Sequence, residues 1–152
     1  MQLHPQWVSG FVDGEGTFYV GINSNLTMTI GYQVLPEFRV VQHERDVSLL
    51  YELKRFFKAG VVRNNHGDRF ELRIRKLEVL QNTVIPFFET YPLQTKKRHD
   101  FQKFKEIVGL MRSNRHLEKD GLLNIIEIAC QMNRADKQKT IKIKKKLLES
   151  EG

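Results

Sequence analysis

The sequence has 152 residues, of which 40% are hydrophobic, and it carries a net charge of +7. This length suits one domain with its own core, the composition excludes a disordered chain, and the basic excess favours an anionic partner such as nucleic acid, although solubility alone would also account for it. No apolar run approaches about 20 residues, the N-terminus has no signal-peptide pattern and the single Cys130 permits no internal disulfide, so we expect an intracellular protein without a membrane span.

The first two predicted elements are a helix and a strand that meet at Asp13. Apolar residues from 3 to 12 recur at helical spacing, and those from 17 to 23 alternate as on one face of a strand. The later predicted elements are a loop 24–31, a strand 32–42 that contains Pro36, a helix 47–58 capped by Asp46 and ended by Gly60, a hairpin of 61–64 and 69–75 turned around 65–68, a helix 76–88 broken late by Pro86, and helices 94–111 and 120–132. This order predicts an α+β fold with one antiparallel sheet covered on one face.

The junction between the first helix and the first strand places acids where they are electrostatically unfavourable. Asp13 and Glu15 stand at a helix C-terminus, where the macrodipole is already negative. Gly14 and Gly16 permit the positive φ that closes a helix, and they allow close approach of another backbone. Carboxylates next to unpaired carbonyls are typical ligands of a hard cation, so the junction is a candidate metal site.

The second hairpin has a strictly alternating strand with a basic face. Phe70, Leu72 and Ile74 point to one side, and Arg69, Glu71, Arg73 and Arg75 to the other, just as Glu37 and Arg39 share one side of the earlier strand. Arginine forks suit guanine edges and phosphates, and a two-stranded ribbon fits the major groove of DNA. A charged solvent face would give the same pattern, so the residues alone leave both interpretations open.

The C-terminal segment is predicted to lie outside the main domain. We place one domain at 1–133 and a basic tail at 134–152. Apolar residues in the tail indicate a partial helix, but a solvated basic tail is the interpretation we prefer.

The nine residues from Val8 to Gly16 resemble the LAGLIDADG motif of homing endonucleases. Gly10, Asp13 and Gly16 match the motif identically, and Glu15 keeps the carboxylate of its second aspartate. The resemblance implies an αββαββα core with an antiparallel four-stranded saddle sheet and appended C-terminal helices. Because the sequence has one copy of the motif, as the homodimeric members do, we expect a homodimer through the motif helix. The predicted interface residues are Ser9, Gly10 and Asp13.

The resemblance also implies a metal-dependent catalytic site. Glu15 is the predicted metal ligand, with the Gly14 carbonyl as a second, and Gln42 matches a position that holds the metal-bound water network. We expect Mg²⁺ as the cofactor, with Mn²⁺ able to substitute and Ca²⁺ able to bind without supporting cleavage. The five histidines are scattered without metal-ligand spacing.

A lysine completes the predicted catalytic set. Lys96 falls where the family has a lysine next to the scissile phosphate, in a Leu-x-Thr-Lys-Lys string that resembles one found in the family. An ordinary basic helix start would also account for it, and Lys97 or Arg98 could take the role instead.

The DNA-facing residues are expected on the open side of the saddle sheet. This set rests on strand parity, so a shift by one residue would change it. Its members are Tyr19, Asn23, Asn25, Gln33, Arg39, Arg63, Asn65, Arg69, Glu71 and Arg73.

The predicted function is that of an intron-encoded homing endonuclease that cleaves both strands of a long, nearly palindromic DNA site as a homodimer. The expected location is the bacterial cytoplasm or an organelle, either chloroplast or mitochondrion. The alternatives are an intron RNA maturase, for which intron RNA would be a partner, and a DNA-binding protein that does not cleave. Retention of Glu15, Gln42 and Lys96 favours the nuclease, because a protein that only binds has no need of the acid.

Overall fold

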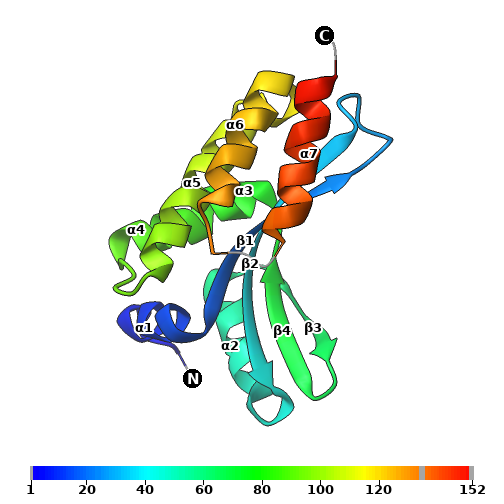
Figure 1. The fold of residues 1–152 in the computed structure, drawn as a ribbon. Coiled ribbons are helices and arrows are strands. Elements are labelled where there is room, and N and C mark those ends of the chain that lie inside the picture. Colours follow the sequence, from blue (N-terminus) through cyan, green and yellow to red (C-terminus); the bar gives the residue numbers. More distant parts are fainter. Residues whose placement is uncertain (1, 134–135, 151–152) are drawn as a thin grey trace. The chain divides into compact units, whose positions relative to one another are not determined.

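The computed structural model describes residues 2–133 and 136–150, and it confirms the α+β fold with the predicted order of elements (Figure 1). No helix among these residues is long and apolar enough to span a membrane. The elements are α1 (Pro5–Glu15), β1 (Gly16–Ser24), β2 (Tyr32–His43), a 3₁₀ turn (Glu44–Asp46), α2 (Val47–Phe57), β3 (Val61–His66), β4 (Arg69–Ile74), α3 (Leu77–Val79), a π-helical turn (Leu80–Val84), α4 (Ile85–Thr90), α5 (Lys97–Arg112), a 3₁₀ turn (Arg115–Leu117), α6 (Lys119–Cys130) and α7 (Lys137–Glu149).

The four strands form one sheet in the order β1-β2-β4-β3. β4 is antiparallel to both of its neighbours, with Arg73 opposite Arg39 of β2 and Glu71 opposite Arg63 of β3. The β3–β4 register shifts between Asn64 and His66, and the connecting turn is shorter than predicted. Because side chains alternate along a strand, these charged residues all lie on one face of the sheet, as their parity predicts.

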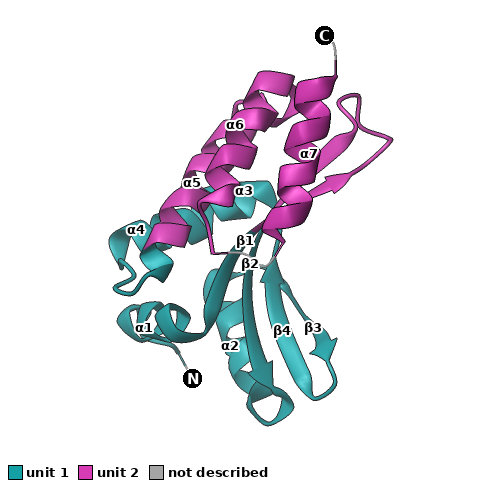
Figure 2. Ribbon diagram, viewed as in Figure 1, with its two compact units in different colours: residues 1–19, 37–98 teal, residues 20–36, 99–152 magenta. Residues whose placement is uncertain are grey.

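The chain divides into two compact units, shown in different colours in Figure 2. The first unit contains residues 1–19 and 37–98, and its core is an aromatic cluster on the covered face of the sheet. Phe38, which is fully buried, lies with its ring centroid 5.6 Å from that of Phe57 in α2, and the Phe18 and Phe88 centroids are 5.5 Å apart. The polar side chains of the adjacent positions are therefore left on the open face.

The second unit contains residues 20–36 and 99–152, and its buried apolar residues include Phe104 of α5, Ile125 of α6 and Ile143 of α7. α7 packs on α6 with its buried residues Thr140, Ile143 and Leu147. The preference for a solvated tail is therefore wrong for residues 136–150, where an amphipathic helix buries an apolar face. Residues 134, 135, 151 and 152 lie outside the described residues, and the domain boundary at 133 stays a prediction.

Two glycines at the end of α1 do not use the positive φ that a glycine permits. Gly14 is helical and Gly16 has a φ of −84°, so neither takes the left-handed region. Gly16 is required for a different reason, because a Cβ there would lie 2.6 Å from Val12 Cγ1 and 3.0 Å from the Val12 carbonyl oxygen. The strand can therefore leave the helix at this point only if residue 16 has no side chain.

Asp46 is the N-cap of α2 as predicted, but details at this and two other predicted helix boundaries differ. The Asp46 side chain makes no capping hydrogen bond. The left-handed residue that ends α2 is Lys58, with φ 56°, and Gly60, with φ 103°, provides the close approach to Leu72 of β4. Pro86 does not break a helix, because it lies in the first turn of α4, where a missing amide is tolerated.

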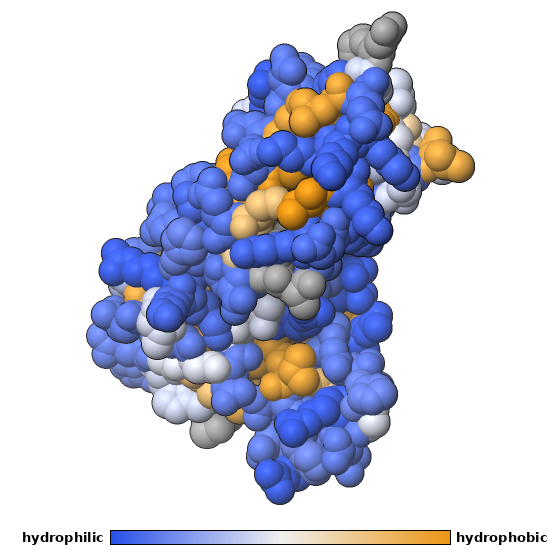
Figure 3. All heavy atoms as spheres, in the orientation of Figure 1, coloured by the Kyte–Doolittle hydropathy of each residue, from blue (hydrophilic) through white to orange (hydrophobic). Residues whose placement is uncertain are grey.

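Figure 3 shows a face that is mostly hydrophilic, with apolar atoms in separate small groups. Exposed large apolar side chains include Trp7 in α1 and Leu26 in the β1–β2 loop.

Candidate active site and DNA-facing surface

The structure brings together two of the three predicted catalytic residues. Glu15 is the last residue of α1 and is exposed, and Gln42 lies near the end of β2. The Gln42 side-chain amide donates to Glu15 Oε2 at 3.5 Å, which is the long limit of a hydrogen bond. A carboxylate held in this way at a helix end remains open to solvent and to a cation.

Gly14 supplies the second predicted oxygen ligand. It lies in the last turn of α1, where carbonyls have no intrahelical partner. Among residues 2–133 and 136–150, no group of three or more His, Cys, Asp or Glu residues could hold a metal ion. The described residues therefore offer Glu15 and the Gly14 carbonyl as hard oxygen donors, and an ion bound there would need ligands from elsewhere.

Asp13 fixes the segment that precedes α5. Its Oδ2 accepts the Gln94 amide at 2.7 Å, and its Oδ1 accepts both the amide of Thr95 at 3.0 Å and the Thr95 hydroxyl at 2.5 Å. Burial raises the pKa of Asp13, but these hydrogen bonds and the nearby Lys97 charge outweigh it and lower the pKa below the ordinary 3.8. Because Gln94 and Thr95 bind this carboxylate, α5 begins at Lys97, three residues later than predicted.

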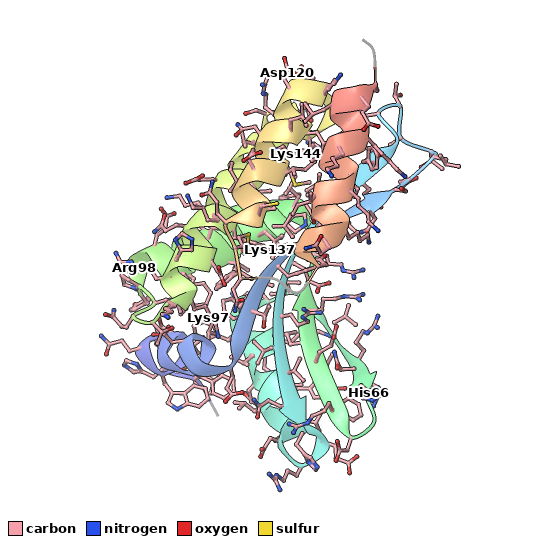
Figure 4. The ribbon with its side chains drawn as sticks, viewed as in Figure 1. His66, Lys97, Arg98, Asp120, Lys137 and Lys144 are labelled. Carbon is pink, nitrogen blue, oxygen red and sulfur yellow. The ribbon has the colours of Figure 1, made fainter. Side chains whose placement is uncertain are left out.

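Lys96 lies between two anchored residues. Thr95 is held by Asp13, and the Lys97 ammonium donates to the Val12 carbonyl at 3.2 Å, near the end of α1 (Figure 4). The Lys96 side chain is exposed and makes no hydrogen bond or ion pair within the described part of the chain. Since the Lys97 ammonium already binds a carbonyl of α1, the geometry favours Lys96 over Lys97 as the cation for an anionic ligand at the start of α5.

The three predicted interface residues of α1 differ in how they are used. Ser9 is 6% exposed and donates to the Tyr91 carbonyl at 2.7 Å, so Ser9 and Asp13 both bind their own chain. Gly10 is exposed, and a Cβ built on it meets nothing within 4 Å. A hollow of about 270 Å³ adjoins Gly10, with Tyr91 and Pro92 in its lining. The backbone of α1 is therefore open to approach at Gly10.

The open face of the sheet in the first unit carries two buried acids among arginines. Glu37 and Glu71 are each 4% exposed. Glu71 accepts the Asn65 side-chain amide at 2.6 Å and lies 3.8 Å from Arg63. The predicted DNA-facing Glu71 is thus covered by its neighbours, which leaves Arg63 and Asn65 as the exposed groups.

Glu37 is surrounded by three arginines. Arg75 donates to it at 2.6 Å, and Arg39 and Arg73 lie at 3.3 Å and 3.9 Å. The Arg39 guanidinium also lies 5.5 Å from the centroid of the Tyr19 ring. The predicted set included Arg39 and Arg73 but missed Glu37 and Arg75, although strand parity already placed both on this face.

The remaining predicted DNA-facing residues occur in two places. Arg69 begins β4 and is exposed. In the second unit, Asn25 donates to the Gln33 side chain at 3.2 Å, and Lys139 of α7 donates to Asn23 at 2.5 Å. Lys139 was missed, because the sequence does not indicate where α7 packs.

A family model described as LAGLIDADG endonuclease matches residues 8–108. The probable intron-encoded endonuclease 2 of Neurospora crassa is 35% identical over 133 residues, which are 86% of this chain and 29% of that relative. The DNA endonuclease I-CeuI of Chlamydomonas moewusii is 30% identical over 138 residues, which are 87% of this chain and 63% of I-CeuI. The chain therefore spans less than two thirds of the length of these curated relatives.

Solved structures show the same fold. The crystal structure of I-TnaI, a homing endonuclease, has a TM-score of 0.93 and 54% identity, with coverage of 97% of this chain and 99% of that chain. The LAGLIDADG homing endonuclease I-SmaMI, bound to cleaved DNA, has a TM-score of 0.91 and 31% identity, with coverage of 96% of this chain and 49% of that chain. With its motif at the end of α1 and its αββαββα core, the chain belongs to the LAGLIDADG endonuclease family.

Proposed function

We propose that this chain is a site-specific DNA endonuclease that acts as a homodimer and uses divalent metal ions to hydrolyse both strands of a long, nearly palindromic site. The observation that carries the proposal is the exposed Glu15 carboxylate at the end of α1, within hydrogen-bonding distance of Gln42. I-CeuI, a DNA endonuclease, and I-TnaI, a homing endonuclease, are similar to this chain.

The chemistry assigns one role to each residue. Glu15 and the Gly14 carbonyl would hold Mg²⁺ or Mn²⁺, and a bound divalent ion supplies charge stabilisation and an activated water at a phosphodiester. Gln42 orients the Glu15 carboxylate through its side-chain amide, and the other hydrogen-bonding groups of this amide bind water. Lys96 places a positive charge against the phosphate whose charge develops during cleavage.

A homodimer would supply the second motif that cleavage of two strands requires. The sequence has one copy of the motif. Two strands require two such sites, and a two-fold assembly supplies a second Glu15. Gly10 and Gly14, which have nothing within 4 Å of a built Cβ, would allow two α1 helices to cross closely. A two-fold protein then favours a palindromic site.

The DNA interface is assigned to the open face of the sheet. In the first unit it comprises Tyr19, Arg39, Arg63, Asn65, Arg69 and Arg73, with Glu71 holding Arg63 and Asn65. In the second unit it comprises Asn23, Asn25 and Gln33. I-SmaMI has been crystallised with an uncleaved DNA target in the presence of calcium ions, and we expect Ca²⁺ to support binding without cleavage here too. An organellar or bacterial location stays a prediction.

The test is cleavage of a plasmid library with a randomised site, in Mg²⁺ and in Ca²⁺, by the native chain and by Glu15→Gln. We expect site-specific double-strand cuts in Mg²⁺ only, and a loss of about 100-fold or more in Glu15→Gln, because a metal ion supplies several kcal/mol of transition-state stabilisation. Glu78→Gln, which neutralises an exposed acid on α3, is the charge-matched control and should cut normally.

Three outcomes would redirect the proposal. Cutting by Glu15→Gln at the native rate would remove Glu15 from the metal site. Binding of DNA without any cutting would favour the non-cleaving alternative, and selective binding of intron RNA would favour the maturase.

A further inference from the structure

Glu37 is a buried acid that three cations share. It is 4% exposed and stands in β2, two residues before Arg39. Its Oε1 accepts Arg75 Nε at 2.6 Å and lies 3.9 Å from Arg73 Nε, and its Oε2 lies 3.3 Å from Arg39 Nη1. Both oxygens of one carboxylate are therefore engaged by guanidinium groups from β2, β4 and the residue after β4.

The contacts leave the ends of two of the three arginines available, whereas Arg39 approaches Glu37 through its terminal Nη1. Arg73 and Arg75 approach Glu37 through Nε, so their two terminal Nη groups are not used by the carboxylate. The side chains of Arg39, Arg73 and Arg75 remain 31%, 18% and 47% exposed. A pair of Nη groups is the edge that reads O6 and N7 of guanine, and a guanidinium already fixed in direction loses less entropy when it binds.

The Glu37 carboxylate also changes the net charge of the cluster that it forms with Arg39, Arg73 and Arg75. Three guanidinium groups and one carboxylate carry +2 together, whereas the arginines alone would carry +3. Separate, mobile cations favour phosphates, which carry no sequence information, while oriented forks favour base edges. Glu37 therefore acts on the balance between non-specific and specific binding.

We propose that Glu37 is a specificity-determining positioning residue, which directs Arg39, Arg73 and Arg75 toward DNA bases and limits their attraction for phosphate. The inference rests on the proposed DNA-binding function and adds a residue that itself need not contact DNA. Removal of Glu37 should therefore strengthen non-specific DNA binding and weaken discrimination between DNA sequences.

The test is a salt titration of binding in Ca²⁺, with a mixed-sequence duplex and with the site recovered from the plasmid library. For Glu37→Gln we expect about 3- to 10-fold tighter binding of the mixed duplex at low salt, and a slope of log K against log salt that is steeper by up to about 0.9, the value for one more phosphate contact. The ratio of specific to non-specific affinity should fall about 10-fold, as for a lost bidentate base contact.

The matched control is Glu52→Gln. Glu52 pairs with Arg55 at 2.7 Å on α2, which packs on the covered face of the sheet, so this change also releases an arginine but away from the open face. Its slope and discrimination should equal those of the native chain. A merely destabilised protein would bind both duplexes more weakly, so tighter non-specific binding separates the proposal from a loss of folding.

Two further variants separate charge from orientation. Glu37→Gln combined with Arg75→Gln returns the cluster to +2, so non-specific affinity should return to the native value while discrimination stays low. Glu37→Asp keeps the charge with a shorter arm, so it should lower discrimination with an unchanged salt slope, and it serves as the test if Glu37→Gln does not fold.

The outcomes distinguish this inference from the proposed function. A native chain that binds neither duplex would overturn the proposed function. A native chain that discriminates, with Glu37→Gln unchanged in slope and ratio, would overturn the role of Glu37 alone. Full recovery of discrimination in the double variant would show that only net charge matters and would overturn the positioning role.

Discussion

Replacing Asp13 by asparagine should weaken both the fold and the cleavage reaction. The native carboxylate accepts three hydrogen bonds, from the Gln94 amide and from the amide and hydroxyl of Thr95. Asparagine keeps one oxygen but turns the other acceptor into an NH₂ donor. One backbone amide of the segment before α5 would then face a donor instead of an acceptor.

The expected magnitude follows from these contacts. A hydrogen bond to a charged group contributes about 1.5–3 kcal/mol, and bonds that share one acceptor are not additive. We therefore expect Asp13→Asn to lower the free energy of unfolding at pH 7 by about 1.5–3 kcal/mol. Because Lys96 directly follows Thr95, the lysine should also shift, and a displacement of about 1 Å costs about 100-fold in rate.

The pH dependence gives a second readout. The lowered pKa of Asp13 means that its contribution is fully present above the ordinary 3.8 and is lost as pH falls through the folded-state pKa. Urea unfolding from pH 7 down to pH 3 should show the native chain losing its advantage over Asp13→Asn in the acid range. The control is Asp46→Asn, because Asp46 makes no capping bond and should change stability by less than about 0.5 kcal/mol. Equal stability of Asp13→Asn and the native chain at pH 7 would refute the reasoning.

Two other substitutions test the interface and the tail. If the chain forms the proposed homodimer, Gly10→Leu should convert it to a monomer in sedimentation without loss of stability. Gly109→Leu, at another helical glycine with nothing within 4 Å of a built Cβ, should leave the association unchanged. Dissociation of both variants, or of neither, would count against the α1 interface. Ile143→Ala should lower the free energy of unfolding by about 2–5 kcal/mol, because Ile143 is 6% exposed, whereas Ile141→Ala, at 39% exposure, should cost less than about 1 kcal/mol; equal effects in urea unfolding would contradict the packing of α7.

Local patterns made the fold predictable. The change from helical to alternating spacing at Asp13 located α1 and β1 closely, because both periods arise from side-chain burial. Strand parity placed Arg39, Arg73 and Arg63 on one face, and the register confirms that arrangement. Parity follows from the alternation of side chains along a single strand. The face on which a residue lies can therefore be predicted without knowing which strands pair.

Long-range contacts limited how much of the site could be predicted from the sequence. The Asp13–Thr95 bonds join residues 82 apart in sequence, and Arg75 reaches Glu37 across 38 residues. Neither pairing produces a periodic pattern in the sequence. The sequence could therefore not show that Asp13 anchors a loop or that three arginines surround Glu37. The glycine at 16 was singled out correctly, but its cause is steric contact with Val12, which only coordinates reveal.

The motif separates into helical stripes with distinct contacts. Val8 and Val12, one turn apart, are fully buried. Ser9 and Asp13, also one turn apart, bind the segment that leads into α5, at Tyr91 and at the residues after Pro92. Because residues four apart share one face of a helix, the two members of each pair contact the same part of the fold.

The remaining stripe explains why the motif repeats small residues. Gly10 and Gly14 are exposed, and a Cβ at either would meet nothing in the described chain, so their own fold does not require glycine. A helical glycine costs about 0.5–1 kcal/mol relative to alanine, and the helix carries that cost twice on a single face. Close approach of a second helix is the physical reason that would offset it, and Glu15, the next residue, would then stand where two copies of α1 meet.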